Sequence, residues 1–342
     1  MNKKIIVIVQ PGQEGKMKKF QFLSDIEGVE LQFIDECIIE SKTGLMRNRQ
    51  MERMGPDSFE YTKEYIAALS SSNIIITAMS PVPSAAYEGG NVEAVCILRS
   101  GVENVDLAKA AVAGVKVINA PGRLAIPVSE YTVGLIIAEM KNIARGYSVL
   151  SKGVWNNKFP NRPYNINIKG ANVGIIGCGA VGARVAKVMA AMDANILVYD
   201  PYVDPKVLQA KGFKSVGLEE LCKESDVMCM HFRLTEETKG LVNAKHFAIM
   251  KPTAFIINTA RAELVDQEAL LDALKNKKIG GAALDVFTEE PLPSDSPFIG
   301  LDNVTITPHL AGDCSNIFDI TFEIVADCLK KYFDESVWIN VV

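Results

Sequence analysis

Three apolar runs in the second half of the chain are each followed by residues that could move a proton or hold an acid. "FIINTARAELVD" contains Arg261, "GAALDVFTEEPLP" contains Asp285, Glu289 and Glu290, and "VTITPHLAGD" contains His309. An arginine binds a carboxylate through parallel hydrogen bonds, and a histidine exchanges a proton near neutral pH. Taken singly, each has a plainer interpretation: a solvated arginine, an acidic turn and a histidine that caps a strand. After successive apolar runs, they indicate acid–base chemistry.

A glycine-rich segment precedes these residues. "NVGIIGCGAVGARVAKVMAAM" runs from an apolar stretch through Gly177, Gly179 and Gly182 into a helix-like stretch. The first glycine allows a tight turn, the second lets a pyrophosphate approach the backbone, and the third lets the helix pack closely on the strand. The N–H groups of Ala180 and Val181 would then face the phosphates at the positive end of the helix. The segment predicts a dinucleotide site.

An acid follows at the position that such a site requires. Asp200 ends the next apolar run, "NILVYD", at about the 20-residue distance expected for a carboxylate that binds a ribose. Its negative charge would repel a 2′-phosphate, and no arginine follows closely. The alternative is that Asp200 only forms a turn before Pro201. We expect the cofactor to be NAD rather than NADP, and we expect no metal site.

The elements that must position these residues are short apolar strands alternating with helix-length segments. The predicted strands are "KIIVIV", "NIIITA", "AVCIL" and "VKVIN" in the first part, and "NVGIIG", "NILVYD", "DVMCMH", "AFIINT", "GAALDV" and "NVTIT" after residue 170. Near-continuous apolar strands of this kind form parallel sheets that are covered on both faces. We predict an α/β fold of two doubly wound, Rossmann-like domains with a cleft between them.

The predicted domains are a substrate-binding domain of residues 1–121 plus 312–342 and an NAD-binding domain of residues 122–311. "PVSEYTVGLIIAEMKNIARGYSVL" predicts one helix from Pro127 to Leu150, with the proline at the first helical position. Its apolar residues cover more than one face, so it should be buried on several faces, either within the chain or against a second subunit.

Composition excludes several classes of protein. The chain has 342 residues, 48% of them hydrophobic, and a net charge of −5, which fits two packed domains and argues against a nucleic-acid partner. No apolar run approaches the roughly 20 residues of a membrane span. "MNKKIIVIVQPG" is better interpreted as a first strand than as a signal peptide. Seven cysteines without a CxxC pair favour a reducing cytoplasm.

The combined pattern resembles a known family. "VGIIGCGAVG", "NTARAELVD", "GAALDVFTEEPLP" and "TPHLAG" occur in the order and spacing of the D-isomer-specific 2-hydroxyacid dehydrogenases, which include D-3-phosphoglycerate, D-lactate and glyoxylate/hydroxypyruvate enzymes. The resemblance implies that Arg261 binds the substrate carboxylate, that His309 is the acid/base and that Glu290 pairs with it. It also implies a small 2-oxo or 2-hydroxy acid as substrate, and a homodimer with the helix after Pro127 in the interface.

The resemblance implies further contacts. The "LRSGVE" loop would form part of the substrate site through Arg99 and through the backbone N–H groups of Ser100, Gly101 and Val102. His231 would line the cofactor cleft, whereas His246 lies in an amphipathic segment and is predicted to be structural. The remaining cofactor contacts implied by the family are Thr238, Thr259, Asp285, His309 and Ala311.

The chain departs from the family pattern at four positions. Ala262 and Glu263 stand where two glycines usually follow the arginine, Arg233 replaces a proline, and Leu124 replaces an asparagine. Formate dehydrogenase shares the fold, but that subgroup pairs its histidine with glutamine, so Glu290 argues against it. An NAD-responsive binding protein, like the transcriptional corepressors built on this scaffold, stays open as the alternative. Sequence alone does not decide among D-2-hydroxyacid substrates.

Overall fold

The computed structural model describes residues 2–38, 50–51 and 53–342. The chain divides into two compact units: unit 1 is residues 1–123 with 315–342, and unit 2 is residues 124–314. From the sequence, the boundaries between the two domains were predicted after residues 121 and 311. No helix of the described residues has the length and apolar character needed to cross a bilayer.

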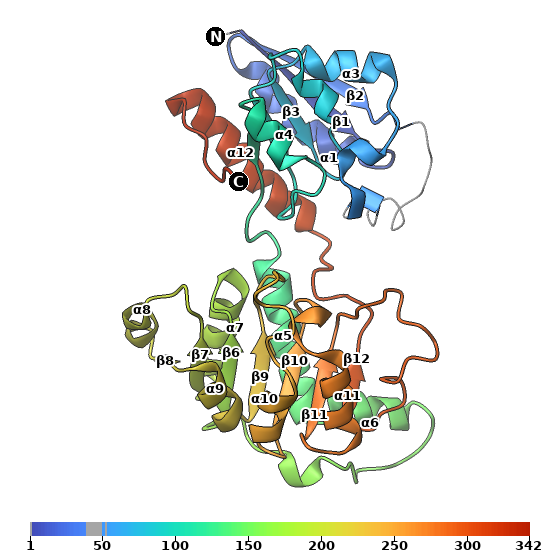
Figure 1. Cartoon of the computed structure of the whole chain (residues 1–342), viewed down its shortest axis with the longest axis vertical. Helices are drawn as coiled ribbons and strands as arrows, with labels where there is room; N and C mark the ends of the chain where they lie inside the picture. The colour runs from blue at the N-terminus through green and yellow to red at the C-terminus, as the bar shows by residue number, and fades with distance from the viewer. Residues whose placement is uncertain (1, 39–49, 52) are drawn as a thin grey trace. The chain divides into compact units, whose positions relative to one another are not determined.

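Within its described residues, unit 1 contains a five-stranded parallel sheet in the order β2-β1-β3-β4-β5 (Figure 1). This is the order 2-1-3-4-5 of doubly wound folds. The strands are β1 (Lys3–Val9), β2 (Val29–Asp35), β3 (Ile74–Thr77), β4 (Ala94–Ile97) and β5 (Lys116–Ile118). The helical segments are α1 (Glu14–Met17), η1 (Lys18–Asp25), η2 (Pro56–Ser58), α3 (Lys63–Ser70), η3 (Ser84–Tyr87), α4 (Leu107–Val112) and α12 (Ile317–Glu335).

Both faces of the unit 1 sheet are covered. Alternate residues of β1 point to opposite faces, so Ile5 and Ile6 belong to different apolar clusters. The first cluster includes Val325 and Leu329 from α12, and the second includes Leu69 from α3. The C-terminal helix α12 is therefore part of the unit 1 core.

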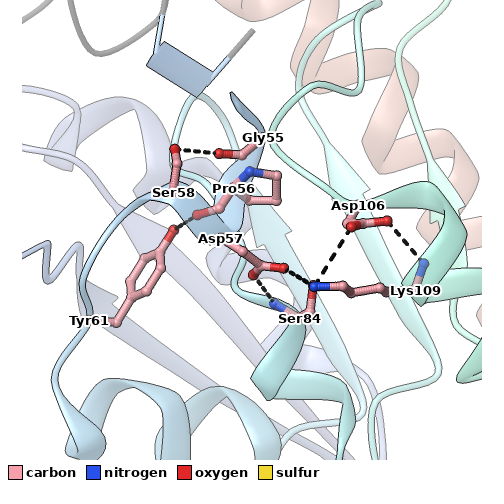
Figure 2. Close-up of polar contacts among 8 residues, drawn as sticks. All are labelled: Gly55, Pro56, Asp57, Ser58, Tyr61, Ser84, Asp106 and Lys109. Carbon is pink, nitrogen blue, oxygen red and sulfur yellow. Dashed lines mark hydrogen bonds and ion pairs between the residues drawn. The ribbon is translucent and has the colours of Figure 1, made fainter. Parts of the chain in front are cut away.

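Polar contacts fix the loops of unit 1. The Asp57 carboxylate accepts hydrogen bonds from the Ser84 backbone N–H at 2.8 Å and from the Ser84 hydroxyl at 2.5 Å. It also forms an ion pair with Lys109 of α4, whose Nζ lies 2.7 Å from Oδ2 (Figure 2). The pair lies at the surface, where solvent screens it, so its contribution to stability is small. These contacts tie η2, η3 and α4 together.

Unit 2, which is described throughout, contains a seven-stranded parallel sheet in the order β12-β11-β10-β9-β6-β7-β8 (Figure 1). The strands are β6 (Asn172–Ile176), β7 (Asn195–Tyr199), β8 (Lys214–Ser215), β9 (Val227–Met230), β10 (Phe255–Asn258), β11 (Gly281–Leu284) and β12 (Val304–Ile306). The helical segments are α5 (Ala125–Met140), α6 (Ile143–Leu150), η4 (Arg162–Tyr164), α7 (Ala180–Ala191), α8 (Pro205–Ala210), α9 (Leu218–Glu224), α10 (Ala244–Ile249), η5 (Ala262–Leu264) and α11 (Gln267–Lys275).

Helices cover both faces of this sheet as well. Helices α5, α7 and α8 contribute to one apolar cluster, and α9, α10 and α11 contribute to the other. The two parallel sheets confirm the predicted α/β class with two doubly wound domains. His246 lies in α10, where its Nδ1 accepts a hydrogen bond from the Asn243 backbone N–H at 3.2 Å, so it caps the start of that helix.

The predicted helix from Pro127 to Leu150 is wrong in two respects. The first helix, α5, already begins at Ala125, so Pro127 is its third residue. The helix then ends at Met140, and α6 starts after Asn142, whose backbone is left-handed with φ of 57°. Asparagine tolerates this conformation better than most residues, which explains why the chain changes direction there.

Candidate active site

The glycine-rich turn lies between β6 and α7. Gly177 has φ of +94°, a conformation that favours glycine. A Cβ atom on Gly182 would lie 2.0 Å from the carbonyl oxygen of Gly177, so only glycine lets α7 pack this closely. A Cβ on Gly179 would meet no heavy atom within 4 Å, so the backbone there is open. Helix α7 begins at Ala180 and directs its first N–H groups to this open side.

Asp200 lies beside this turn. It follows β7, and its Oδ2 accepts a hydrogen bond from the Cys178 backbone N–H at 2.7 Å. Its Oδ1 accepts one from the Tyr202 N–H at 2.9 Å. A carboxylate has about four acceptor positions, so two stay available for hydroxyl donors. The turn, the start of α7 and Asp200 together fit the diphosphate and ribose of a dinucleotide.

His231 follows β9, the strand next to β6, and its backbone N–H donates to the Ile176 carbonyl at 2.8 Å. Its ring Nε2 is buried and has no hydrogen-bond partner in the described part of the chain. Burial lowers the pKa of His231 to about 4, so the ring is neutral at pH 7. A buried nitrogen without a partner next to the glycine-rich turn fits a site that a bound nucleotide completes.

Arg261 follows β10 and is positioned through its backbone. The Asn258 side chain donates to the Arg261 carbonyl at 2.9 Å and accepts from the Ala260 N–H at 3.0 Å. The guanidinium itself is exposed, and its Nη1 donates to the Ala260 carbonyl at 2.7 Å. Within the described residues it forms no ion pair, so its remaining donors are available to an anion.

His309 and Glu290 are in direct contact. Their Nδ1 and Oε2 atoms lie 2.7 Å apart, although the residues follow different strands, β12 and β11. Glu290 is itself oriented, because its Oε1 accepts a hydrogen bond from the Phe287 N–H at 3.0 Å. The other ring nitrogen of His309 takes part in none of the hydrogen bonds found among the described residues. The histidine is therefore oriented through one nitrogen and open at the other.

The loop that carries His309 is held by Asp285, which is fully buried. Asp285 Oδ1 accepts hydrogen bonds from the Thr307 hydroxyl at 2.6 Å and the Leu310 N–H at 2.9 Å, and Oδ2 accepts one from the Ala311 N–H at 2.8 Å. His309 has φ of 55°, an unusual value outside glycine. The buried carboxylate thus holds the loop on both sides of a strained backbone position.

Two further residues that the family implies as cofactor contacts bond to the protein itself. Thr238 donates its hydroxyl to the Arg233 carbonyl at 2.7 Å. The hydroxyls of Thr259 and Thr132 of α5 lie 2.7 Å apart. The first contact holds the backbone at Arg233, and the second holds Thr259 against helix α5.

The four residues that depart from the family pattern differ in their burial and contacts. Ala262 is buried in η5, and the Glu263 carbonyl accepts a hydrogen bond from the Gly240 N–H at 2.8 Å. Leu124 lies against Gly312, since a Cβ atom there would be 3.5 Å from its methyl carbons. Arg233 is exposed.

In unit 1, the "LRSGVE" loop follows β4. The Ser100 hydroxyl donates to the Ala120 carbonyl at 2.9 Å, and the Asn119 side chain donates to the Ser100 carbonyl at 2.7 Å. Arg99 forms an ion pair with Glu103, with Nη2 and Oε2 3.5 Å apart. The Glu103 carboxylate lies directly over Gly101: a Cβ on that glycine would be 2.3 Å from Oε2.

Sequence reasoning missed Asn258 and Thr307, which position Arg261 and His309. Asn258 ends the buried strand "FIIN", and Thr307 follows the half-buried strand "VTI". That placement is a usable signal, because a polar side chain at a buried strand end needs a partner.

The comparisons with known proteins agree with this geometry. Residues 133–311 match the model described as D-isomer specific 2-hydroxyacid dehydrogenase, NAD binding domain. D-3-phosphoglycerate dehydrogenase of Methanocaldococcus jannaschii is 40% identical over 71% of this chain, but the match spans only 46% of that protein. Hydroxypyruvate reductase of Blautia hydrogenotrophica is 31% identical over 93% of this chain and 95% of that protein.

Solved structures give the same fold. D-lactate dehydrogenase with NAD⁺ from Lactobacillus jensenii superposes with a TM-score of 0.76 over 99% of both chains at 23% identity. The chain belongs to the D-isomer-specific 2-hydroxyacid dehydrogenase family, and its residues 133–311 are the NAD-binding domain of that family.

Proposed function

We propose that the chain catalyses the NAD(H)-dependent interconversion of a 2-oxo acid and a D-2-hydroxy acid. The observation that carries the proposal is the contact of 2.7 Å between His309 and Glu290 in a chain of this family. A carboxylate at this distance fixes the orientation of the imidazole ring, so that its other nitrogen can exchange a proton with a substrate.

The proposed roles follow from the chemistry of each side chain. When bound, NADH supplies the hydride that reduces the carbonyl carbon. Arg261 binds the substrate carboxylate, since a planar guanidinium matches its two oxygens. Negative charge develops on the carbonyl oxygen, and His309 donates its proton there, which leaves a hydroxyl group. In the reverse direction, neutral His309 accepts that proton.

Further residues complete the proposed binding set. The backbone N–H groups of Ser100, Gly101 and Val102, together with Arg99, bind the substrate. The proposed NAD contacts are Gly177, Gly179, Ala180, Val181, Gly182, Asp200, His231, Thr238, Thr259, Asp285, His309 and Ala311. Gly179 supports this set most directly, because its surroundings leave space for a diphosphate.

We also propose that the chain is a homodimer in a reducing compartment such as the cytoplasm. Helix α6 and the residues after it expose large apolar side chains, with Trp155 exposed to 85% and Tyr147 to 76%. Such a group of exposed apolar residues is typical of a protein–protein interface. The seven cysteines, all of them in the described part of the chain, form no disulfide, which fits a reducing environment.

The first experiment is NADH oxidation by the purified protein with a panel of 2-oxo acids: glyoxylate, pyruvate, hydroxypyruvate, phosphohydroxypyruvate, 2-oxoglutarate and a branched acid. NADPH is run in parallel, and we expect NADH to be favoured because Asp200 repels a 2′-phosphate. His309→Ala should lower kcat by at least about a hundredfold, the usual size of a general acid contribution.

The same variant provides the control, because NADH binding, followed by fluorescence titration, should stay nearly unchanged. Turnover that survives in His309→Ala would contradict the assigned role. If the wild-type protein binds NADH tightly but turns over no member of the panel, the proposed reaction is wrong and a binding protein responsive to NAD becomes the better explanation.

A further inference from the structure

Arg123 in unit 1 is an unusual arginine. It is half-buried, and its Nε is completely buried without a hydrogen-bond partner in the described part of the chain. Among the described residues, its side chain makes a single hydrogen bond, which is long: 3.4 Å from Nη1 to the hydroxyl of Thr321 on α12. A buried guanidinium donor that makes no hydrogen bond is unfavourable, and the positive charge of the group increases the penalty.

The charges around Arg123 do not compensate for this. No carboxylate of the described residues pairs with it. Burial lowers the pKa of Arg123, and the positive charge of Arg99 lowers it further. Lys109 in the same unit shows the ordinary arrangement, since its Nζ lies 2.7 Å from Asp57 and 3.9 Å from Asp106 (Figure 2). Two neighbouring guanidinium groups are stabilised when an anion binds to them.

The neighbouring loop already holds one carboxylate. Glu103 places its carboxylate over Gly101 and 3.5 Å from Arg99. The Ala120 N–H donates to the Arg99 carbonyl at 2.8 Å, so the chain leading to Arg123 runs beside the start of this loop. This region therefore already accommodates one anionic group, the carboxylate of Glu103. Arg123 supplies a further hydrogen-bond donor that this carboxylate does not use.

We propose that Arg123 is a specificity-determining residue that binds a second anionic group of the substrate. The preferred substrate is then a 2-oxo acid that also carries a phosphate or a second carboxylate. This inference rests on the proposed function. Both anions present oxygens that match the planar donor fork of an arginine.

The test compares substrates that differ in the second anionic group. The pairs are hydroxypyruvate with phosphohydroxypyruvate, and 2-oxopentanoate with 2-oxoglutarate, so the two arms distinguish phosphate from carboxylate. We expect the wild-type kcat/KM to be at least about tenfold higher for the anionic member of one pair, mainly through a lower KM. Arg123→Gln should abolish this preference, and Arg123→Lys should retain part of it.

Lys116→Gln is the matched control, because Lys116 is an exposed lysine at the start of β5 in the same unit and the change removes the same charge. It should leave the preference unchanged. A second readout does not depend on turnover: with saturating NADH, inorganic phosphate should raise the Tm of the wild type more than that of Arg123→Gln, at equal ionic strength.

The outcomes separate the two hypotheses. Turnover without a preference for the anionic member, or a preference that survives in Arg123→Gln, overturns this inference and leaves the proposed function intact. No turnover of any 2-oxo acid refutes the proposed function. In that case the phosphate shift decides the inference: a shift that depends on Arg123 supports the anion site, and equal shifts in both proteins refute it.

Discussion

His231 shows how a single buried ring links pH to stability. Burial lowers its pKa to about 4 from the ordinary value of 6.5. Below about pH 6.5 the unfolded chain binds a proton at this ring, whereas the folded chain leaves it neutral until about pH 4. The unfolded state therefore binds more protons in this window. The free energy of unfolding must fall as the pH decreases from about 6.5 to about 4.

His231→Gln should remove this contribution, because glutamine does not titrate. When the pH is lowered from about 7.5 to about 5, we expect the wild type to lose about 2 kcal/mol of unfolding free energy relative to the variant. Urea unfolding of the protein without NADH at both pH values measures it. A difference that is the same at both values would contradict a buried, neutral histidine.

The candidate site could be predicted in part. Glu290 and His309 carry distinctive chemistry after apolar runs, so their contact could be inferred from the sequence. The grouping of Arg261 with them stays a prediction. Asn258 and Thr307 were missed because asparagine and threonine after a strand usually form turns. The burial of Arg123 could not be predicted. An arginine after Pro-Gly indicates an exposed turn, and its contact Thr321 lies 198 residues later in the chain.

At the level of elements, a buried ion pair joins α5 to α6, and a hydrogen bond from the same carboxylate joins them to β12. Glu139 of α5 is fully buried, and its Oε1 lies 2.5 Å from Nη2 of Arg145 on α6. Its Oε2 accepts a hydrogen bond from the Thr305 hydroxyl on β12 at 2.7 Å. Burial raises the pKa of Glu139, and the guanidinium of Arg145 opposes that shift. The charge on Glu139 depends on its partner.

Arg145→Met should therefore destabilise unit 2 by about 3 kcal/mol or more, since it leaves a carboxylate buried without its counter-charge. The double variant Glu139→Leu with Arg145→Met should recover most of that loss, because two apolar residues need no pairing. Urea unfolding of the wild type, both single variants and the double variant gives the coupling. Additive losses in the double variant would show that the pair is not coupled.

The fold was predictable where strands are buried on both faces. The ten predicted strands all correspond to apolar runs of the two sheets. Two strands, β2 and β8, were not predicted, and both lie at sheet edges. In β2 half-buried and exposed residues are mixed, and both residues of β8 are exposed. Both lack the run of apolar residues that marks the other strands, including the edge strands β5 and β12, which were predicted.

At the level of the whole molecule, the exposed apolar residues of α6 and the following segment are where we expect a second copy to bind. Trp155→Glu combined with Tyr147→Glu should convert a dimer into a monomer, because two charges would be buried in an apolar interface. Size-exclusion chromatography with light scattering measures the mass directly. Lys152→Glu, an exposed change in the same segment, is the control. A wild-type protein that is monomeric at high concentration would refute the homodimer.

The division of unit 1 between the two ends of the chain sets an order of events during synthesis. Residues 124–314 leave the ribosome as a continuous stretch that contains every strand of the seven-stranded sheet. The core of unit 1 lacks Val325, Cys328 and Leu329 until α12 emerges. The NAD-binding domain can therefore fold while its companion, although begun first, still exposes an incomplete apolar face. The unit that is begun first is therefore completed last.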